Sequence, residues 1–295
     1  MSYQIGMIVA HSKVIPLFSS LDLHRAEFCL IEPEAKWKLD ALIAANGLKY
    51  GVHCPLYKPV DHPEKNSLLS SIVDGEEERR LESVGFMEQA IRDAEELGGE
   101  YVVVHAQRPE NFGGDNPAGF DEAAALDSAK RGCECLLSES QRRGVPVFIE
   151  NLFHNRAFYS PASFSALLES FPEFGFCLDI GHLDVDSREF GFPFDEFLDA
   201  VMPYLREIHL QNSTSRPTEE VPRPWKYPVH PSQKPEDGWC DIPAILEKIL
   251  CARPDCLINF ESRIMLPDDE QVIREGMEWI KGLVPELLGN CVYDD

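Results

Sequence analysis

The chain has 295 residues, 44% of them hydrophobic, which is enough to bury one large core. Domains of α/β proteins commonly reach about 250 residues, so we expect a single domain over residues 1–295. Asp and Glu outnumber Lys and Arg by 51 to 27, and the formal net charge of −24 disfavours a nucleic-acid partner, because basic residues must neutralise phosphates. With no leader-like N-terminus and no apolar run of about 20 residues, we expect a cytoplasmic protein without membrane contact.

Nine cysteines show no regular spacing, and without an export signal we expect all of them to be reduced thiols. Cys133 and Cys135 lie two positions apart in a helical pattern and therefore point to different faces. Cys54, Cys177 and Cys240 lie close to the motifs described below. Free cysteine usually behaves as a small buried hydrophobe, so we interpret these three as packing residues.

Strand-like and helix-like segments alternate along the whole chain, which indicates roughly eight β/α units and a parallel sheet. Helix ends are marked by Asn46-Gly47 and Gly98-Gly99, and a helix start by Ser160-Pro161. Strands are predicted at 5–9, 27–32, 48–52, 101–104 and 206–210, and directly before Glu150, Asp179 and Glu261. Helices are predicted at 37–45, 76–97, 119–143, 161–170, 193–202, 241–251 and 268–283.

Nearly every predicted strand ends in a side chain that can bind a metal. A doubly wound sheet concentrates its site at one switch point, whereas an α/β barrel collects catalytic residues from many strand ends at one mouth. The pattern therefore predicts a single (β/α)8 TIM barrel. The strand-end residues are His53, His105, Glu150, Asp179 with His182 just beyond, His209 and Glu261.

Taken singly, each of these residues has a structural interpretation. A lone histidine at a strand end is usually hydrogen-bonded structure, and a carboxylate such as Asp179 can cap the next helix. Three carboxylates and several histidines aimed at one mouth together predict a metal centre. Carboxylate and imidazole ligands suit a divalent ion: we expect zinc, with manganese, iron or cobalt as alternatives, and no closed structural zinc site.

Two connections are too long to be plain loops, at 54–75 and 211–240. The second is rich in proline and aromatic residues, and proline stiffens a loop by fixing φ. It also carries Arg216, Arg223, Lys226 and Lys234 within an acidic chain. We interpret it as a lid over the substrate; the alternative is a packing loop that closes the barrel rim.

Six motifs, in order along nearly the whole chain, resemble the xylose-isomerase-like TIM barrel superfamily. This group unites sugar-phosphate isomerases and epimerases with endonuclease IV-like enzymes, the AP endonuclease 2 family. The resemblance is specific for the superfamily and leaves the reaction open. The motifs are His53-Cys54-Pro55-Leu56-Tyr57, residues 95–105, Ile149-Glu150-Asn151, Leu178-Asp179-Ile180-Gly181-His182, Ile208-His209-Leu210 and Phe260-Glu261-Ser262.

The resemblance implies how the ligands are shared between ions. In the isomerase branch, four matching residues hold one divalent ion, and the two glutamates among them act as acid and base. In the endonuclease IV branch the same four residues hold one zinc ion. The first of the two glutamates also binds a second zinc ion, which two histidines hold. The four residues here are Glu150, Asp179, His209 and Glu261, and the two histidines are His53 and His105.

A third zinc of the endonuclease IV branch uses a position matching His182 and an Asp-x-His pair after the seventh strand. This chain has His230 but Pro228 in place of the aspartate, and two ligands seldom retain zinc. We therefore expect His182 and His230 to approach each other without an ion and to act on a substrate oxyanion. The alternative is that Asp237 or Asp241 replaces the missing carboxylate.

The Ile149-Glu150-Asn151 motif resembles the endonuclease branch, which favours hydrolysis, but the acidic charge disfavours DNA. We expect a two-metal hydrolase of a small phosphoester or amide, a description that cobamide-type amidohydrolases also fit. The alternative is a one-metal sugar or sugar-phosphate isomerase or epimerase. A barrel that only binds a ligand is disfavoured because both glutamates are present. The residues expected to contact the small-molecule substrate are Asn151, Gln211, Asn212, Arg216 and Trp239.

Overall fold

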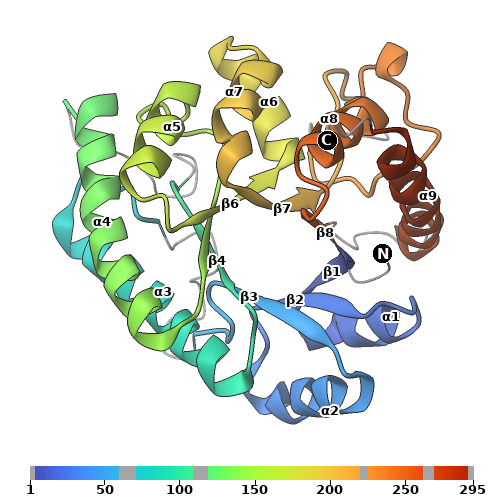
Figure 1. Ribbon diagram of the computed structural model, residues 1–295, viewed down its shortest axis with the longest axis horizontal. Coiled ribbons are helices and arrows are strands. Elements are labelled where there is room, and N and C mark those ends of the chain that lie inside the picture. Colours follow the sequence, from blue (N-terminus) through green and yellow to red (C-terminus); the bar gives the residue numbers. More distant parts are fainter. Residues whose placement is uncertain (1–3, 60–70, 109–118, 220–224, 262–268, 292–295) are drawn as a thin grey trace.

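The computed structural model describes residues 4–59, 71–108, 119–219, 225–261 and 269–291. Eight parallel strands close into a barrel in sequence order, with β8 pairing back onto β1 (Figure 1). The predicted single (β/α)8 TIM barrel is confirmed. The strands are β1 (Ile5–Ala10), β2 (Arg25–Cys29), β3 (Lys49–His53), β4 (Val102–His105), β5 (Val147–Glu150), β6 (Gly175–Asp179), β7 (Leu205–Leu210) and β8 (Leu257–Phe260).

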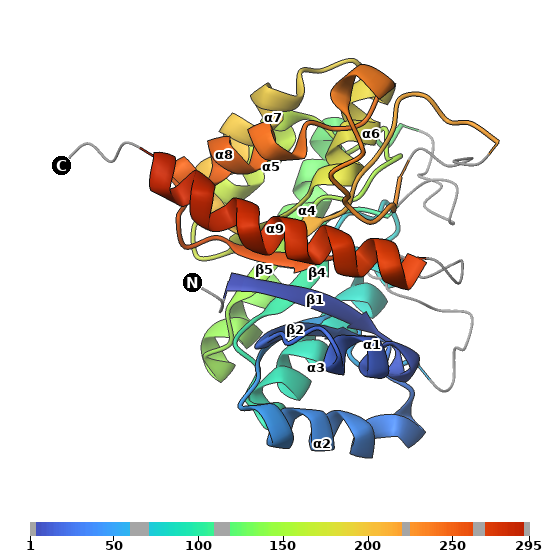
Figure 2. The ribbon, with the colours of Figure 1, turned by 90° about the vertical axis from the view of Figure 1, so that its right-hand side faces the viewer.

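Helices surround the barrel, and the C-terminal helix α9 (Asp269–Asn290) runs along its outer side next to β1 (Figures 1 and 2). The predicted helix start at Ser160-Pro161 is confirmed, because the Ser160 hydroxyl accepts a hydrogen bond from the Ser163 N–H at 3.1 Å. The helices are α1 (Ile15–Ser19), α2 (Lys36–Asn46), α3 (Glu77–Leu97), α4 (Glu122–Arg143), α5 (Pro161–Ser170), α6 (Ile180–Phe190), α7 (Phe194–Val201), α8 (Ile242–Ala252) and α9 (Asp269–Asn290).

Two elements differ clearly from their predicted extents. The second strand covers Arg25–Cys29 rather than 27–32, because it pairs in register with β1 and β3 and because Leu30 turns the chain at φ 51°. Helix α9 extends past 283 to Asn290, since buried Val284 and Leu287 continue its apolar stripe. Helix α1 had no predicted counterpart, and α6 was expected only as the helix that Asp179 could cap.

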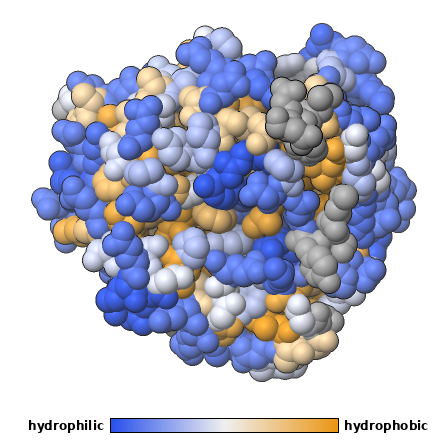
Figure 3. All heavy atoms as spheres, in the orientation of Figure 1, coloured by the Kyte–Doolittle hydropathy of each residue, from blue (hydrophilic) through white to orange (hydrophobic). Residues whose placement is uncertain are grey.

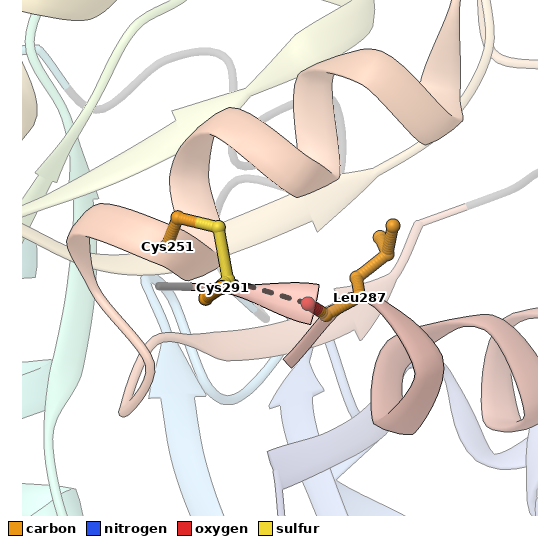
Figure 4. Close-up of a disulfide and its surroundings, with 3 residues drawn as sticks. All are labelled: Cys251, Leu287 and Cys291. Atoms are coloured by element: carbon orange, nitrogen blue, oxygen red, sulfur yellow. Dashed lines mark hydrogen bonds between the residues drawn. A yellow bond between two sulfur atoms is a disulfide. The ribbon is translucent and has the colours of Figure 1, made fainter. Parts of the chain in front are cut away.

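One disulfide corrects the expectation that every cysteine is a reduced thiol. Cys251 near the end of α8 is bonded to Cys291 after α9, and the Sγ of Cys291 lies 3.3 Å from the carbonyl oxygen of Leu287 (Figure 4). Packing of α8 against α9 brings together two residues that are 40 positions apart, which spacing alone does not reveal. The other seven cysteines are free, and those interpreted as packing residues are buried or half-buried.

The surface is consistent with a chain in which 26% of the residues are charged. The face shown in Figure 3 is largely hydrophilic, with hydrophobic residues between hydrophilic ones. Among the helices of the described part of the chain, none combines the length and the apolar character that crossing a bilayer requires.

Candidate metal centre

The predicted ligands meet at the carboxyl ends of the strands. Side chains alternate between the two faces of a strand, so residues two positions apart share the barrel interior. Val103, Phe148 and Cys177 lie together in a small buried cluster with Tyr101, each two positions before a predicted ligand. The strands thus place a buried layer within the barrel, apolar at these residues and polar at Glu207 and Asn259, and the candidate ligands one layer above it. Those ligands are His53, His105, Glu150, Asp179, His209 and Glu261.

Glu150 lies between two groups of possible ligand atoms, each group within 4.8 Å. Its Oε2 is 3.0 Å from the Nε2 of His53 and 3.2 Å from the Nε2 of His105. Its Oε1 is 3.2 Å from the Nδ1 of His209. One carboxylate oxygen of Glu150 therefore faces His53 and His105, and the other faces His209. A carboxylate that bridges two metal ions has this arrangement. The second group consists of Glu150, Asp179, His209 and Glu261.

The residues fit a divalent cation. The Nδ1 of His209 is buried and makes no hydrogen bond in the described structure, although it lies 3.2 Å from Glu150 and 3.8 Å from Glu261. A buried polar atom of this kind normally has a partner, and a metal ion is one. Imidazole nitrogen with carboxylate oxygen is a donor set that zinc, manganese and iron accept.

The electrostatics of the second group also favour a cation. Burial raises the pKa of Asp179 well above its usual range, and the neighbouring Glu261 carboxylate raises it further. Burial alone would raise the pKa of Glu150 as well, but His209 and His105 outweigh it and hold that pKa well below the usual range. Buried carboxylates this close together repel one another unless positive charge lies between them.

His182 lies at the edge of this group on the first turn of α6. Its Nδ1 is 3.1 Å from the carbonyl oxygen of Asn151 and 3.4 Å from Asp179, while its buried Nε2 makes no hydrogen bond in the described structure. Burial and the Lys226 ammonium lower the pKa of His182 to about 3, so the ring is neutral. Asp179 also caps α6, accepting the His182 N–H at 2.8 Å, so the capping interpretation is confirmed.

His230 lies elsewhere. Its Nδ1 is 2.7 Å from the hydroxyl of Ser232, and its Nε2 is 3.0 Å from Glu275 on α9. Among the contacts of the described residues, none joins His230 to His182, so the expected approach of the two rings is not observed. The loop after β7 packs His230 against α9 instead.

Neither aspartate that was considered as a substitute ligand reaches His230. Asp241 caps α8, accepting the Ala244 N–H at 3.2 Å, and Asp237 ends the short 3₁₀ helix η7 (Pro235–Asp237). The carboxylate that pairs with His230 is that of Glu275, which no motif predicted.

Of the five residues expected to contact substrate, Gln211 lies among the ligands. Its Nε2 donates to Asp179 and lies 3.5 Å from Glu261. Asn151 instead holds the backbone of Asp179: its Nδ2 donates to the carbonyl oxygen at 3.1 Å, and its Oδ1 accepts the amide N–H at 3.0 Å.

The other three residues make contacts within the long loop after β7 in this structure. Asn212 donates through Nδ2 to Gln233 at 2.8 Å, and the exposed Arg216 donates to the carbonyl oxygen of Glu236 at 2.9 Å. Trp239 packs edge-to-face on Tyr227, with ring centroids 5.4 Å apart. Residues 220–224 of this loop, with the predicted Arg223, and residues 60–70 of the other long loop lie outside the described residues.

Lys226 is a site residue that the motifs did not single out. Its ammonium contacts the Oε1 of Glu261, and the two side chains are only 19% and 16% exposed. Burial would lower the pKa of Lys226, but the Glu261 and Asp179 carboxylates raise it, so the group is a cation. The available signal was a basic residue between two aromatic ones, Trp225 and Tyr227, in an acidic chain.

The neighbours of Lys226 explain how a loop residue reaches the ligands. The Trp225 ring packs on Phe153 with centroids 4.9 Å apart, and Phe153 packs on His182 at 4.6 Å. Tyr227 exchanges two backbone hydrogen bonds with Asn212, at 2.8 and 3.2 Å. Lys226 itself has φ 70°, an uncommon conformation for a residue other than glycine, which these flanking contacts stabilise.

A closed (β/α)8 barrel with carboxylates and imidazoles at the strand ends defines a class of α/β-barrel proteins with a candidate metal site. Within that class the chain belongs to the xylose isomerase-like TIM barrel family, whose family model matches residues 26–283. The expected superfamily membership is thereby confirmed. A search of curated proteins found no match.

Solved structures resemble the whole chain. The 3-keto-D-glucoside 4-epimerase YcjR from E. coli has a TM-score of 0.67 and 16% identity, covering 95% of this chain and 99% of its own. An L-ribulose 3-epimerase has a TM-score of 0.69 and 13% identity over 99% of both chains. A Thermus thermophilus protein soaked with ZnCl2 has a TM-score of 0.61 and 17% identity, covering 98% of this chain and 100% of its own.

At these identities the likeness establishes the fold alone. The names of the similar proteins include sugar epimerases, which fits the isomerase or epimerase alternative better than the expected hydrolase. The hydrolase expectation is not supported by these comparisons.

Proposed function

We propose that this protein is a divalent-metal-dependent isomerase or epimerase of a small sugar or sugar phosphate. The observation that carries the proposal is the group of Glu150, Asp179, His209 and Glu261, which contains two glutamates from non-adjacent strands. Family membership and the epimerases among the similar structures support the same reaction class.

The four residues of this group would hold the ion, for which zinc is the first expectation and manganese, iron or cobalt are alternatives. A bound divalent ion would polarise a substrate carbonyl and make the adjacent C–H more acidic. Glu150 and Glu261 would then remove a proton from carbon and return one, the exchange that isomerisation and epimerisation share.

Neighbouring cationic groups keep both glutamates ionised and able to accept a proton. Lys226 lowers the pKa of Glu261 despite burial, and His209 and His105 lower that of Glu150. The neutral His182 has a buried Nε2 that is available to a substrate hydroxyl. Gln211, between Asp179 and Glu261, would orient the substrate by hydrogen bonding.

The segment after β7 would exclude water from the reaction, because Lys226 contacts Glu261 and Trp225 packs on Phe153, which packs on His182. This retains the lid interpretation for residues 211–240.

The test is proton exchange with solvent. Apo-protein reconstituted with Zn²⁺ or Mn²⁺ is incubated in D₂O with tetroses, pentoses, hexoses and their phosphates, and deuterium on carbon is followed by NMR. We expect deuterium next to the carbonyl of at least one sugar, and loss of the signal on chelation and in Glu261→Gln. Glu95→Gln, at a carboxylate of α3 paired with Arg143 of α4 on the outside of the barrel, is the matched control. Absence of exchange across the panel, with metal bound, would contradict the proposal.

A two-metal hydrolase of a small phosphoester or amide is the second candidate, favoured by one observation. His53 and His105 both face the Oε2 of Glu150, which leaves its Oε1 for the other group. Two ions in such an arrangement would share the activation of water and the stabilisation of a leaving group. Metal analysis after zinc reconstitution distinguishes the two candidate functions. A firm stoichiometry of one ion per chain would exclude the two-metal hydrolase.

A further inference from the structure

A buried carboxylate lies beside the candidate centre and belongs to neither ligand group around Glu150. Glu27 on β2 is completely buried, and its Oε1 is 3.0 Å from the Nε2 of His209. The other ring nitrogen of His209, Nδ1, is 3.2 Å from Glu150. The imidazole is therefore held between two carboxylates, one at each nitrogen.

Glu27 could itself be a ligand, because Glu27, His53 and His209 offer atoms within 4.8 Å of one another. The ring of His53 argues against that: its Nε2 faces Glu150 at 3.0 Å, and its Nδ1 is 3.2 Å from the carbonyl oxygen of Cys54. Both nitrogens of His53 are engaged, so an ion beside Glu27 would have only one imidazole.

We propose that Glu27 is a positioning residue for the metal centre: it takes the Nε2–H of His209 and leaves the Nδ1 lone pair for the ion. A histidine that ligates a metal usually donates its other N–H to a carboxylate or carbonyl, which sets the tautomer and the ring orientation. Glu27 is suited to this task because its buried oxygens make no hydrogen bond of good geometry in the described structure. The Nε2 of His209, 3.0 Å from Oε1, makes none either, so a proton held between the two atoms would satisfy both groups. The inference rests on the proposed role of His209 as a ligand, and not on the reaction.

A second buried acid provides a matched control. Glu207 on β7 is as buried as Glu27, but its Oε1 accepts from the hydroxyl of Tyr101 at 2.9 Å and from Asn259. That oxygen is 4.0 Å from the Nε2 of His209, beyond hydrogen-bond distance. The two glutamates thus share residue type and burial but differ in their contact with the ligand.

The experiment measures Zn²⁺ affinity by competition with a chromophoric chelator, in wild type, Glu27→Gln, Glu27→Met and Glu207→Gln. We expect Glu27→Met to bind zinc about 10- to 100-fold more weakly, the usual effect of losing such a partner, with Glu27→Gln between it and wild type. We expect Glu207→Gln to stay within about threefold of wild type, since the 4.0 Å separation gives it no hydrogen bond to the ring. Circular dichroism confirms that each variant is folded.

A second readout follows the ring itself. In the zinc-loaded protein, the Nε2–H proton of His209 should resonate further downfield in wild type and in Glu207→Gln than in Glu27→Met, because only the first two keep a carboxylate that accepts this N–H. A folded Glu27→Met with wild-type zinc affinity would overturn the inference. A wild-type protein that binds no zinc would instead refute the metal centre, so the two failures are distinguishable.

Discussion

Replacing Lys226 by methionine tests whether the carboxylate group needs a cation. The Lys226 ammonium contacts Glu261, and both side chains are largely buried, at 19% and 16% exposure. Methionine has a similar length but no charge, so Lys226→Met leaves Glu261 near Asp179 and Glu150 without its cation. Removing one partner of a buried pair costs about 3–5 kcal/mol, because the other charge is left uncompensated.

The size of the effect on thermal unfolding follows from the chain length. An unfolding entropy of about 2.1 cal/mol/K per residue gives about 0.6 kcal/mol/K for 295 residues. A loss of about 3–5 kcal/mol therefore lowers the Tm of the metal-free protein by about 5–8 °C. A divalent ion supplies the missing positive charge, so saturating Zn²⁺ should raise the Tm of Lys226→Met by more than that of wild type.

The assay is differential scanning calorimetry of chelator-treated and zinc-loaded protein. Lys234→Met is the control, since Lys234 is an exposed lysine of the same loop and its loss should change stability by no more than about 0.5 kcal/mol. Two results would contradict this prediction: a metal-free Lys226→Met with the Tm of wild type, or an equal rise of both Tm values with zinc. Either would mean that the lysine and the ion do not neutralise the same carboxylates.

Three further predictions concern other parts of the molecule. Glu150→Gln should lose more metal than His105→Ala, because Glu150 faces both ligand groups; equal losses by metal analysis would contradict the bridging arrangement. Cys251→Ser should lower the free energy of unfolding by about 4 kcal/mol by removing a cross-link over 40 residues, and denaturant titration without reductant that shows wild-type stability would contradict this. Burial raises the pKa of the Asp186 carboxyl above its ordinary 3.8, so the native state binds a proton at this group more tightly than the unfolded state does. The contribution of Asp186 to the free energy of unfolding therefore falls as pH rises above about 4. Asp186→Asn, which can still accept the His154 N–H, should therefore gain stability relative to wild type between pH 4 and pH 8; a constant difference in urea titrations would refute it.

The sequence by itself determined the barrel and its ring of candidate ligands. Strand and helix periodicity are local properties, and in a parallel barrel every strand delivers its last inward side chain to the same mouth. His105 and Glu150, for example, were recognisable because each ends a short run of β-formers. The same logic placed Asp179 both at the helix cap and in the ligand group.

Only the tertiary structure decided which residues surround those ligands. Glu27 looked like the start of a strand, and its contact with His209 depends on barrel closure, which no local pattern encodes. Lys226 reaches Glu261, and His230 reaches Glu275, because the loop after β7 packs in one particular way on Phe153 and α9. The pairing of Cys251 with Cys291 depends likewise on how α8 packs on α9. Contacts between residues far apart in sequence are set by packing, and packing is a property of the whole fold.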